Sequence, residues 1–433
     1  MRVYRNPPKE TWPELSERPQ LELEFLESAV RNVLNRVKKS GDSALRDLTL
    51  QFDKATVQEL QVTDDEITTA LNAVPDELQS SIRTAAANIE KFHAAQRRES
   101  APIETMPGVS CWRKSVAIDK VGIYIPGGSA PLFSTVLMLG IPAKLAGCKE
   151  IVLCTPPDTA GKINEAIIFS AHLVGIKKIF KVGGAQAIAA MAYGTESIPK
   201  VYKIFGPGNQ YVTKAKQLVT EEGLAIDMPA GPSEVLVMAD DSSTPSFVAA
   251  DLLSQAEHGE DSQVMLVVNN ENLIEPIQSE IEKQIQLLPR KAIAERCLVN
   301  SRVVLLESSS DAIAFANEYA PEHLIVNTRN HEEIVDQITN AGSVFIGNYS
   351  PEAIGDYASG TNHTLPTNGY AKAFAGVSLE SFMKHITFQN LTKEGIAALG
   401  PAVETMAEAE QLMGHKMAVR VRLESLSKKK NDN

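Results

Sequence analysis

From Lys120 onward, short runs of β-branched and other apolar residues alternate with stretches whose apolar residues have helical spacing. The runs predict strands at residues 121–125, 151–154, 178–182 and 203–205. The stretches between and after them predict helices at residues 134–146, 163–173, 185–192 and 211–221. Such alternation is typical of a parallel sheet, because each helix carries the chain back to the start of the next strand.

The alternation starts again after residue 233, with predicted strands at 234–238, 263–268, 323–327 and 343–347. Because 433 residues exceed what one core usually contains, we predict two Rossmann-like α/β domains with parallel sheets, residues 119–233 and residues 234–377. Residues 1–118 are expected to form a helical N-terminal segment that packs on the second α/β domain. Residues 378–433 are expected to form a helical C-terminal arm.

The composition excludes several classes of protein. A net charge of −12 argues against nucleic acid as a partner, since phosphate binding requires clustered Lys and Arg. No uninterrupted apolar stretch is long enough for a membrane span, and no signal-peptide pattern opens the chain. The 4 cysteines are scattered without a CxxC pair, as is typical of reduced thiols. We therefore expect a cytoplasmic globular protein.

One predicted helix ends in polar residues on its apolar face. Val248, Leu252, Gln255 and His258 follow one another at spacings of three and four residues, so they form one stripe. The last two are about one helical turn apart, with Cβ atoms roughly 5–6 Å from each other. An amide and an imidazole at that spacing can reach a single metal ion or substrate. Their burial without partners would be unfavourable, so we expect a ligand to fill the space they face.

The loops after the first-domain strands are rich in Gly and Pro, at residues 124–131, 182–186 and 205–209. Open parallel sheets bind ligands at the carboxyl ends of their strands, and a dinucleotide would suit such a rim. The GxGxxG pattern is incomplete, because Tyr211 follows Gly206 and Gly208 where a third glycine would stand. Tight turns alone would also explain these glycines.

Two further segments carry groups that are able to transfer protons or bind metal. Glu322 and His323 are adjacent at the start of a predicted strand, and imidazole exchanges protons near neutral pH. His363 and Asp356 lie in a long polar stretch, residues 355–369, and such loops commonly form sites. Chance adjacency and a solvated surface loop are the alternatives.

Several of these segments together resemble the histidinol dehydrogenase family. They are residues 124–136, 182–188, 205–209, 227–234, 251–263, 321–324 and 355–369, ordered along nearly the whole chain. The resemblance implies a four-electron oxidation of L-histidinol to L-histidine, through L-histidinal, with two NAD. It also implies one Zn²⁺ per subunit and a homodimer that exchanges its C-terminal arm.

The resemblance also implies roles for individual residues. The zinc ligands would be Gln255, His258, Asp356 and His415, with His415 supplied by the partner subunit. Glu322 and His323 would form the catalytic pair. The substrate would contact Ser233, His363 and Glu410, together with His323 and the zinc ligands. NAD would contact Tyr124, Gln186 and Asn209.

Two other functions are compatible with parts of the sequence. An aldehyde dehydrogenase could work through a cysteine thioester, with Cys111, Cys148, Cys154 and Cys297 as candidates. A non-catalytic zinc-bridged nucleotide sensor would leave Glu322 and His323 idle. Formation of NADH from histidinol distinguishes the enzyme from the sensor, and alkylation of the thiols tests the thioester.

Overall fold

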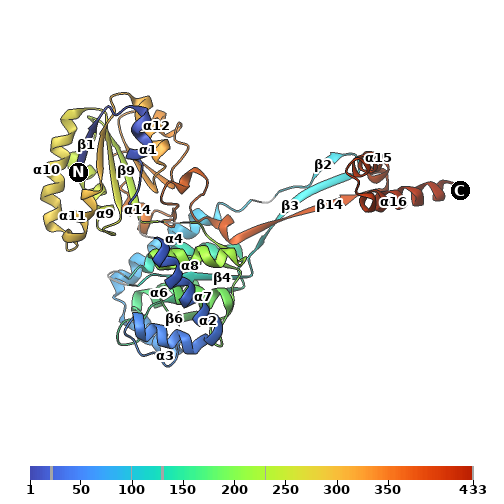
Figure 1. Cartoon of the computed structure of the whole chain (residues 1–433), viewed down its shortest axis with the longest axis horizontal. Helices are drawn as coiled ribbons and strands as arrows, with labels where there is room; N and C mark the ends of the chain where they lie inside the picture. Colours follow the sequence, from blue (N-terminus) through green and yellow to red (C-terminus); the bar gives the residue numbers. More distant parts are fainter. Residues whose placement is uncertain (20–22, 99, 128–130, 230, 432–433) are drawn as a thin grey trace. The chain divides into compact units, whose positions relative to one another are not determined.

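The computed structural model describes residues 1–19, 23–98, 100–127, 131–229 and 231–431. Parts of the segments at 124–136 and 227–234 therefore lie outside the described residues. The chain divides into two compact units (Figure 1). The first contains Met1–Gln96 and Ile118–Phe382, and the second contains Arg97–Ala117 and Met383–Asn433.

The first unit contains a five-stranded parallel sheet in the order β6-β5-β4-β7-β8. Its strands are β4 (Lys120–Tyr124), β5 (Glu150–Thr155), β6 (Lys178–Lys181), β7 (Lys203–Phe205) and β8 (Ala225–Ile226). The connecting helices are α5 (Phe133–Ala146), α6 (Glu165–Val174), α7 (Gly184–Tyr193) and α8 (Gln210–Glu221). The predicted strand–helix alternation is thus confirmed here.

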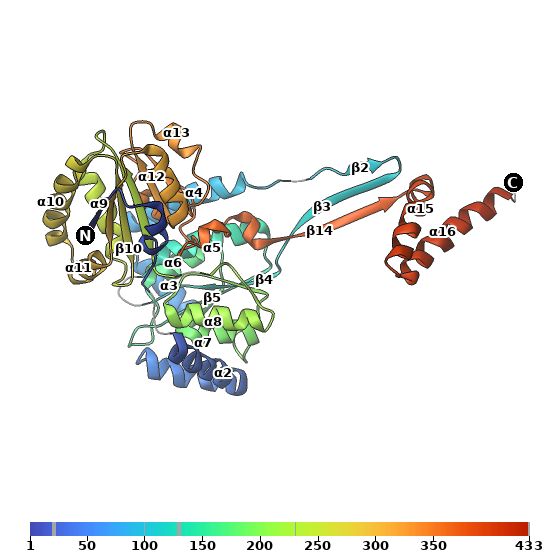
Figure 2. The same cartoon turned by 45° about the horizontal axis from the view of Figure 1, so that its top comes forward.

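A six-stranded parallel sheet in the same unit has the order β1-β11-β10-β9-β12-β13 (Figure 2). Its strands are β1 (Arg2–Arg5), β9 (Glu234–Ala239), β10 (Gln263–Val268), β11 (Arg302–Leu305), β12 (His323–Asn327) and β13 (Ser343–Ile346). Successive residues of the central strands enter different cores, because strand side chains alternate between faces. Burial on both faces explains the continuous apolar runs that predicted this second parallel sheet.

Helices cover both faces of the six-stranded sheet. One core includes residues of α9 (Pro245–Ala256), α10 (Ile274–Gln284) and α11 (Lys291–Val299). The other includes residues of α1 (Trp12–Leu15), α12 (Ser309–Tyr319) and α13 (His331–Val335). A short helix, α14 (Glu352–Tyr357), follows β13 and contacts α9.

The N-terminal segment differs from the prediction in what it packs against. Only β1 and α1 join the six-stranded sheet. The longer helices α2 (Leu23–Phe52), α3 (Asp64–Ala73) and α4 (Asp76–Ala94) contact the helices of the five-stranded sheet instead: α2 contacts α7 and α8, α3 contacts α6, and α4 contacts α5. The reason is the apolar face of each helix; Val30 and Leu45 of α2, for example, enter the core of that sheet.

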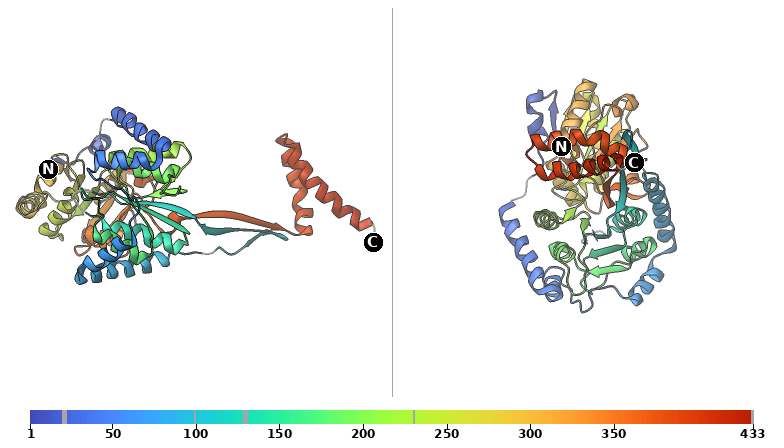
Figure 3. Two further views of the ribbon diagram at one scale, coloured as in Figure 1. Left: turned by 90° about the horizontal axis from the view of Figure 1, so that it is seen from below. Right: turned by 90° about the vertical axis from the view of Figure 1, so that its right-hand side faces the viewer.

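The second unit corrects the expectation that both ends of the chain are entirely helical. Its antiparallel sheet, in the order β14-β3-β2, contains β2 (Ile103–Met106), β3 (Val109–Ala117) and β14 (Met383–Leu391) (Figure 3). Pairing runs from Met383 with Ala117 to Leu391 with Val109. These partners are distant in sequence, so helical spacing in one segment could not reveal the pairing.

After β14, the second unit ends in two helices that contact each other, α15 (Lys393–Ala409) and α16 (Met413–Asn431). These helices belong to the C-terminal arm that the sequence predicted to be helical. Within the described ranges, no helix combines the length and the apolar character that a membrane crossing requires.

Candidate active site

The predicted catalytic and metal-binding residues of the first unit meet at the amino edge of the six-stranded sheet. His323 is the first residue of β12 and pairs with Val235 near the start of β9. Helix α9 runs from the end of β9 back to the start of β10, so Gln255, near its C-terminus, returns to the same edge. The connection from strand to helix to strand therefore explains why a helix end and a strand start share one site.

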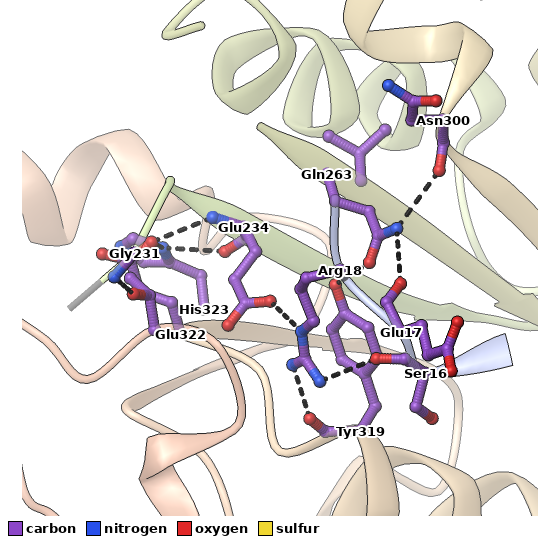
Figure 4. Close-up of polar contacts among 12 residues, drawn as sticks. Ser16, Glu17, Arg18, Gly231, Glu234, Gln263, Asn300, Tyr319, Glu322 and His323 are labelled. Atoms are coloured by element: carbon purple, nitrogen blue, oxygen red, sulfur yellow. Dashed lines mark hydrogen bonds and ion pairs between the residues drawn. The ribbon is translucent and has the colours of Figure 1, made fainter. Parts of the chain in front are cut away.

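The His323 ring lies at the centre of this group and is almost fully buried. Its Nδ1 is 3.0 Å from Gln255 Nε2, and its Nε2 is 3.1 Å from Asp356 Oδ1. Glu322 Oε2 lies 3.6 Å from His323 Nδ1 and accepts a hydrogen bond of 3.0 Å from the backbone N–H of Glu234 (Figure 4). The structure thus brings the predicted pair together with two predicted metal ligands.

The ionisable side chains around His323 change one another's pKa values. Burial raises the pKa of Glu322, and the neighbouring His323 only partly offsets this. Burial alone would lower the pKa of His323, but Glu322 and Asp356 raise it well above its usual value. Burial would raise the pKa of Asp356, whereas its hydrogen bond to His323 and the nearby His363 and His258 hold it below the usual range. Glu322, His323 and Asp356 therefore titrate as coupled groups, which is common in sites that transfer protons.

The polar stripe on α9 is confirmed in part. Val248 and Leu252 are fully buried, and Gln255 is 1% exposed. The helix ends at Ala256, however, so His258 lies beyond it with an exposed side chain. The prediction that both polar residues face a buried gap is therefore wrong for His258, because the chain leaves the helical path before reaching it.

Three of the predicted zinc ligands fit that metal by donor chemistry. Gln255 Oε1 is buried and has no hydrogen-bond partner among the described residues, so it is available as a ligand. Partial desolvation by the surrounding protein lowers the pKa of His258 and favours a neutral nitrogen donor. Asp356 contributes a carboxylate with a lowered pKa. Zinc accepts nitrogen and oxygen donors of these types.

The described residues contain no preformed cluster of three or more His, Cys, Asp or Glu side chains able to hold a metal ion. The fourth predicted ligand, His415, is an exposed residue of α16, and Glu410 is the exposed residue that follows α15. Both belong to the second unit, so the first unit alone contains three of the four predicted ligands.

A cavity of about 1200 Å³ adjoins the catalytic pair, and Ser233, His258, Glu322 and His363 are among its lining residues. The His363 ring is fixed on both sides, since Nε2 lies 3.0 Å from Thr135 Oγ1 and Nδ1 lies 2.7 Å from the carbonyl oxygen of Asp356. Of the predicted substrate contacts of the first unit, Ser233, His258 and His363 line this cavity, whereas Gln255, His323 and Asp356 are not among its lining residues.

A second cavity, of about 1140 Å³, is lined by the three residues predicted to contact NAD: Tyr124, Gln186 and Asn209. The Tyr124 hydroxyl accepts a hydrogen bond of 3.0 Å from the backbone N–H of Gly184, and Gln186 is 1% exposed. Asn209 is exposed, and its Oδ1 caps α8 by accepting from two backbone N–H groups. Asn209 also lines the first cavity, so the two cavities share a boundary.

Glycine is required in the loop after β7. Gly206 has φ of 127°, and a Cβ atom there would collide with the carbonyl oxygen of Tyr124. Gly206 therefore lets the backbone at the ends of β4 and β7 lie in close contact at this rim.

Sequence reasoning missed three charged residues around the site. Glu234 begins β9 and is 1% exposed; a charged residue at the start of an entirely apolar strand was the available signal. Glu352 is equally buried, accepts a 2.5 Å hydrogen bond from Ser254 and has its pKa raised to about 8 by burial. It stands four residues before Asp356, the spacing of one helix face. Arg18, which binds Glu234, had no signal at all.

The cysteines do not support the thioester alternative. Burial raises the pKa of Cys148 to about 12 and that of Cys297 to about 11, and it raises the pKa of Cys154 further. Thiols of this kind are protonated and unreactive at neutral pH. Cys111 lies on β3 in the second unit.

Comparison with known proteins finds relatives along nearly the whole chain. The model of the histidinol dehydrogenase family matches residues 16–423. A histidinol dehydrogenase of Bacteroides fragilis is 60% identical over 428 residues, which cover 99% of this chain and 100% of that protein. One from Yersinia pestis is 51% identical over 406 residues, covering 93% and 91%. The crystal structure of histidinol dehydrogenase from Elizabethkingia anophelis superposes with a TM-score of 0.97 at 58% identity, covering 99% of each chain. The chain belongs to the histidinol dehydrogenase family.

Proposed function

We propose that this chain oxidises L-histidinol to L-histidine through L-histidinal, with two NAD reduced per histidine, at the end of histidine biosynthesis. The observation that carries the proposal is the buried Glu322–His323 pair, with His323 held between Gln255 and Asp356 beside a cavity. The relatives that cover the full chain are named for the same activity, which supports the assignment.

In this proposal, one cavity binds NAD and the other binds the substrate beside the catalytic pair. The 119–233 region would bind NAD through Tyr124, Gln186 and Asn209. The 234–377 region would bind zinc and carry the catalytic pair. The boundary that the cavities share at Asn209 supports this division, because hydride transfer requires the nicotinamide to reach the substrate.

One Zn²⁺ per subunit would be held by Gln255, His258 and Asp356, with His415 as the fourth ligand. When bound, zinc would supply Lewis-acid polarisation and hold the imidazole and amino nitrogens of the substrate; it is redox-silent, so the hydride acceptor is NAD. The unpartnered Oε1 of Gln255 supports a ligand at this point.

The chain's residues would act in two rounds. His323 takes the alcohol proton while a hydride leaves the substrate carbon for the first NAD, giving the aldehyde. Glu322 then accepts a proton from a water molecule as that water attacks the aldehyde carbon, and the protonated His323 gives its proton to the aldehyde oxygen. The hydrated aldehyde forms, and His323 is neutral again. His323 accepts a hydroxyl proton of this hydrate while a second hydride reduces a second NAD. Four electrons leave the substrate, and water supplies the added oxygen.

The remaining residues would orient the substrate and complete the site. Ser233 and His363 line the cavity with Glu322, and Glu410 would contact substrate from the C-terminal arm with His415. We infer a homodimer in which that arm is exchanged. Exposed apolar side chains on α15 and α16, including Met406 and Met417, support an interface there. The unpaired cysteines support a cytoplasmic location.

The test is NADH formation from L-histidinol, with and without a metal chelator. We expect turnover with the metal present and loss of turnover after its removal, while NAD binding measured by titration persists. Full activity in metal-free protein would contradict the role of zinc. Tight ligand binding without NADH formation by the zinc-loaded protein would favour the nucleotide sensor instead.

A further inference from the structure

The backbone of Glu234 contacts both members of the catalytic pair. Its N–H donates to Glu322 Oε2 at 3.0 Å, and its carbonyl oxygen lies 3.3 Å from His323 Nδ1. Figure 4 shows the two contacts on one side of the Glu234 residue, with its side chain directed the other way. The position of Glu234 therefore contributes to the orientation of both Glu322 and His323.

The Glu234 side chain is held in turn by Arg18. Its carboxylate is almost fully buried, and Arg18 Nε donates to its Oε2 at 2.7 Å. Arg18 Nη2 donates to the carbonyl oxygen of Tyr319 at 2.6 Å, and the guanidinium lies 3.8 Å from the centre of the Tyr319 ring. Tyr319 ends α12, three residues before Glu322. Arg18 thus contacts the chain on both sides of the pair, at β9 and at the approach to β12 (Figure 4).

We propose that Arg18 is a positioning residue for the oxidation, because its guanidinium joins Glu234 to the Tyr319 carbonyl and thereby fixes the orientation of Glu322 and His323. This inference rests on the proposed function. A guanidinium suits the role because its planar fork directs several N–H groups at fixed angles, which the single ammonium of lysine cannot do. A buried ion pair commonly contributes little net stability, whereas its geometry can be specific.

The N-terminal segment has other attachments, so loss of the Arg18 side chain should leave the fold intact. Trp12 and Leu15 are buried in the core of the six-stranded sheet. Gln263 Nε2 donates to the carbonyl oxygen of Glu17 at 3.2 Å, and Arg302 donates to the same oxygen at 3.1 Å. A simple anchoring role for Arg18 would therefore be partly redundant.

The experiment compares Arg18→Met and Arg18→Lys with Arg5→Met as the matched control. Arg5 belongs to the same N-terminal segment and pairs with Glu271 at 2.6 Å, but that pair is exposed. We expect Arg18→Met to lower kcat by roughly 10–100-fold, the scale expected for misplaced catalytic groups, with KM for histidinol and NAD changed less than threefold. Arg18→Lys should recover only part of that loss, and Arg5→Met should match the wild type.

A double-mutant cycle with Glu234→Gln tests whether Arg18 acts through Glu234. The double variant should be no slower than the slower single variant, because both changes remove the same contact. A kcat within twofold of wild type for Arg18→Met, with normal zinc content and only a lower Tm, would overturn the inference. An increase in KM at unchanged kcat would also overturn it, by showing that Arg18 binds substrate. NADH formation by the wild type separates the proposed oxidation from the proposed role of Arg18. Its absence would contradict both proposals. Normal turnover by the wild type together with an unaffected Arg18→Met variant would contradict only the role of Arg18.

Discussion

The two parallel sheets of the first unit place their sites at opposite edges. In the five-stranded sheet, Tyr124 ends β4 and Gln186 follows β6, so the predicted NAD contacts lie at the carboxyl edge. In the six-stranded sheet, His323 begins β12 and Glu234 begins β9, so the acid–base group lies at the amino edge. The carboxyl-edge rule for open sheets therefore describes one sheet and not the other.

The difference follows from what each edge offers. Carboxyl edges offer loops and helix N-termini, whose free N–H groups suit phosphates. The amino edge receives helix C-termini, which bring side chains such as Gln255 rather than free N–H groups. The first arrangement suits a nucleotide, and the second suits side-chain ligands and proton transfer.

The substitution His323→Asn is the strongest test of whether the two sheet edges have separate functions. We expect kcat to fall by about 10³-fold or more in both half-reactions, the upper part of the range for loss of a general base. NAD affinity measured by titration should stay within about twofold of wild type, because His323 lies on the other sheet. His331→Asn on α13 is a matched control. A parallel loss of NAD affinity would contradict the separation of the two edges.

Glu322→Gln should distinguish the two members of the pair. We expect oxidation of the aldehyde to fall by about 10²-fold while oxidation of histidinol to the aldehyde falls much less, because only the second half-reaction needs activated water. Single-turnover measurements started from histidinol and from histidinal give the two rates. Glu332→Gln, at an exposed position on α13, should leave both unchanged. Equal losses in the two half-reactions would reject this division of roles.

The substitution Tyr124→Phe tests whether the carboxyl edge of the five-stranded sheet binds NAD. The change removes the acceptor for the Gly184 N–H, so the start of α7 loses a fixed contact beside the second cavity. We expect KM for NAD to rise about tenfold, the effect of one lost hydrogen bond, with kcat nearly unchanged. Steady-state kinetics with NAD varied would measure this. A fall in kcat at constant KM would place Tyr124 in the chemistry instead.

Asp53→Asn should give the smallest effect, on stability rather than rate. Asp53 lines the second cavity, and burial raises its pKa to about 6, whereas an unfolded chain has a value near 3.9. The folded protein therefore holds this proton more tightly, so wild-type stability should fall as pH rises from about 4 to about 6. The variant should match wild type near pH 4 and be more stable by about 1–2 kcal/mol at pH 8, allowing for partial exposure.

Denaturant unfolding of NAD-free protein at the two pH values measures this difference. Asp47→Asn is the control, since Asp47 is exposed on α2, the helix that ends one residue before Asp53. A stability difference between Asp53→Asn and wild type that is the same at both pH values would show that burial of the carboxylate is not its cause.

Sequence periodicity was sufficient for four strands of each sheet, because those strands are mostly apolar and alternate with helices. The strands β1, β8 and β11 were not predicted. Gln255 could also be predicted as a site residue from the sequence, since an amide on an apolar stripe is unusual. The contact of Asp356 with His323 could not be predicted from local sequence, because it joins segments 33 residues apart through a turn in the chain. The pairing of β14 with β3 and the bond from Arg18 to Glu234 join still more distant segments and leave no local pattern. Contacts across the chain, rather than local structure, are what the sequence leaves undetermined.

The most direct test of the proposed function is the number of NADH formed per histidine, measured with L-histidinol as the limiting substrate in zinc-loaded protein. A catalytic pair that serves both oxidations without releasing the aldehyde predicts two NADH for each histidine, with no free histidinal. A ratio of one, or accumulation of the aldehyde, would contradict the four-electron assignment.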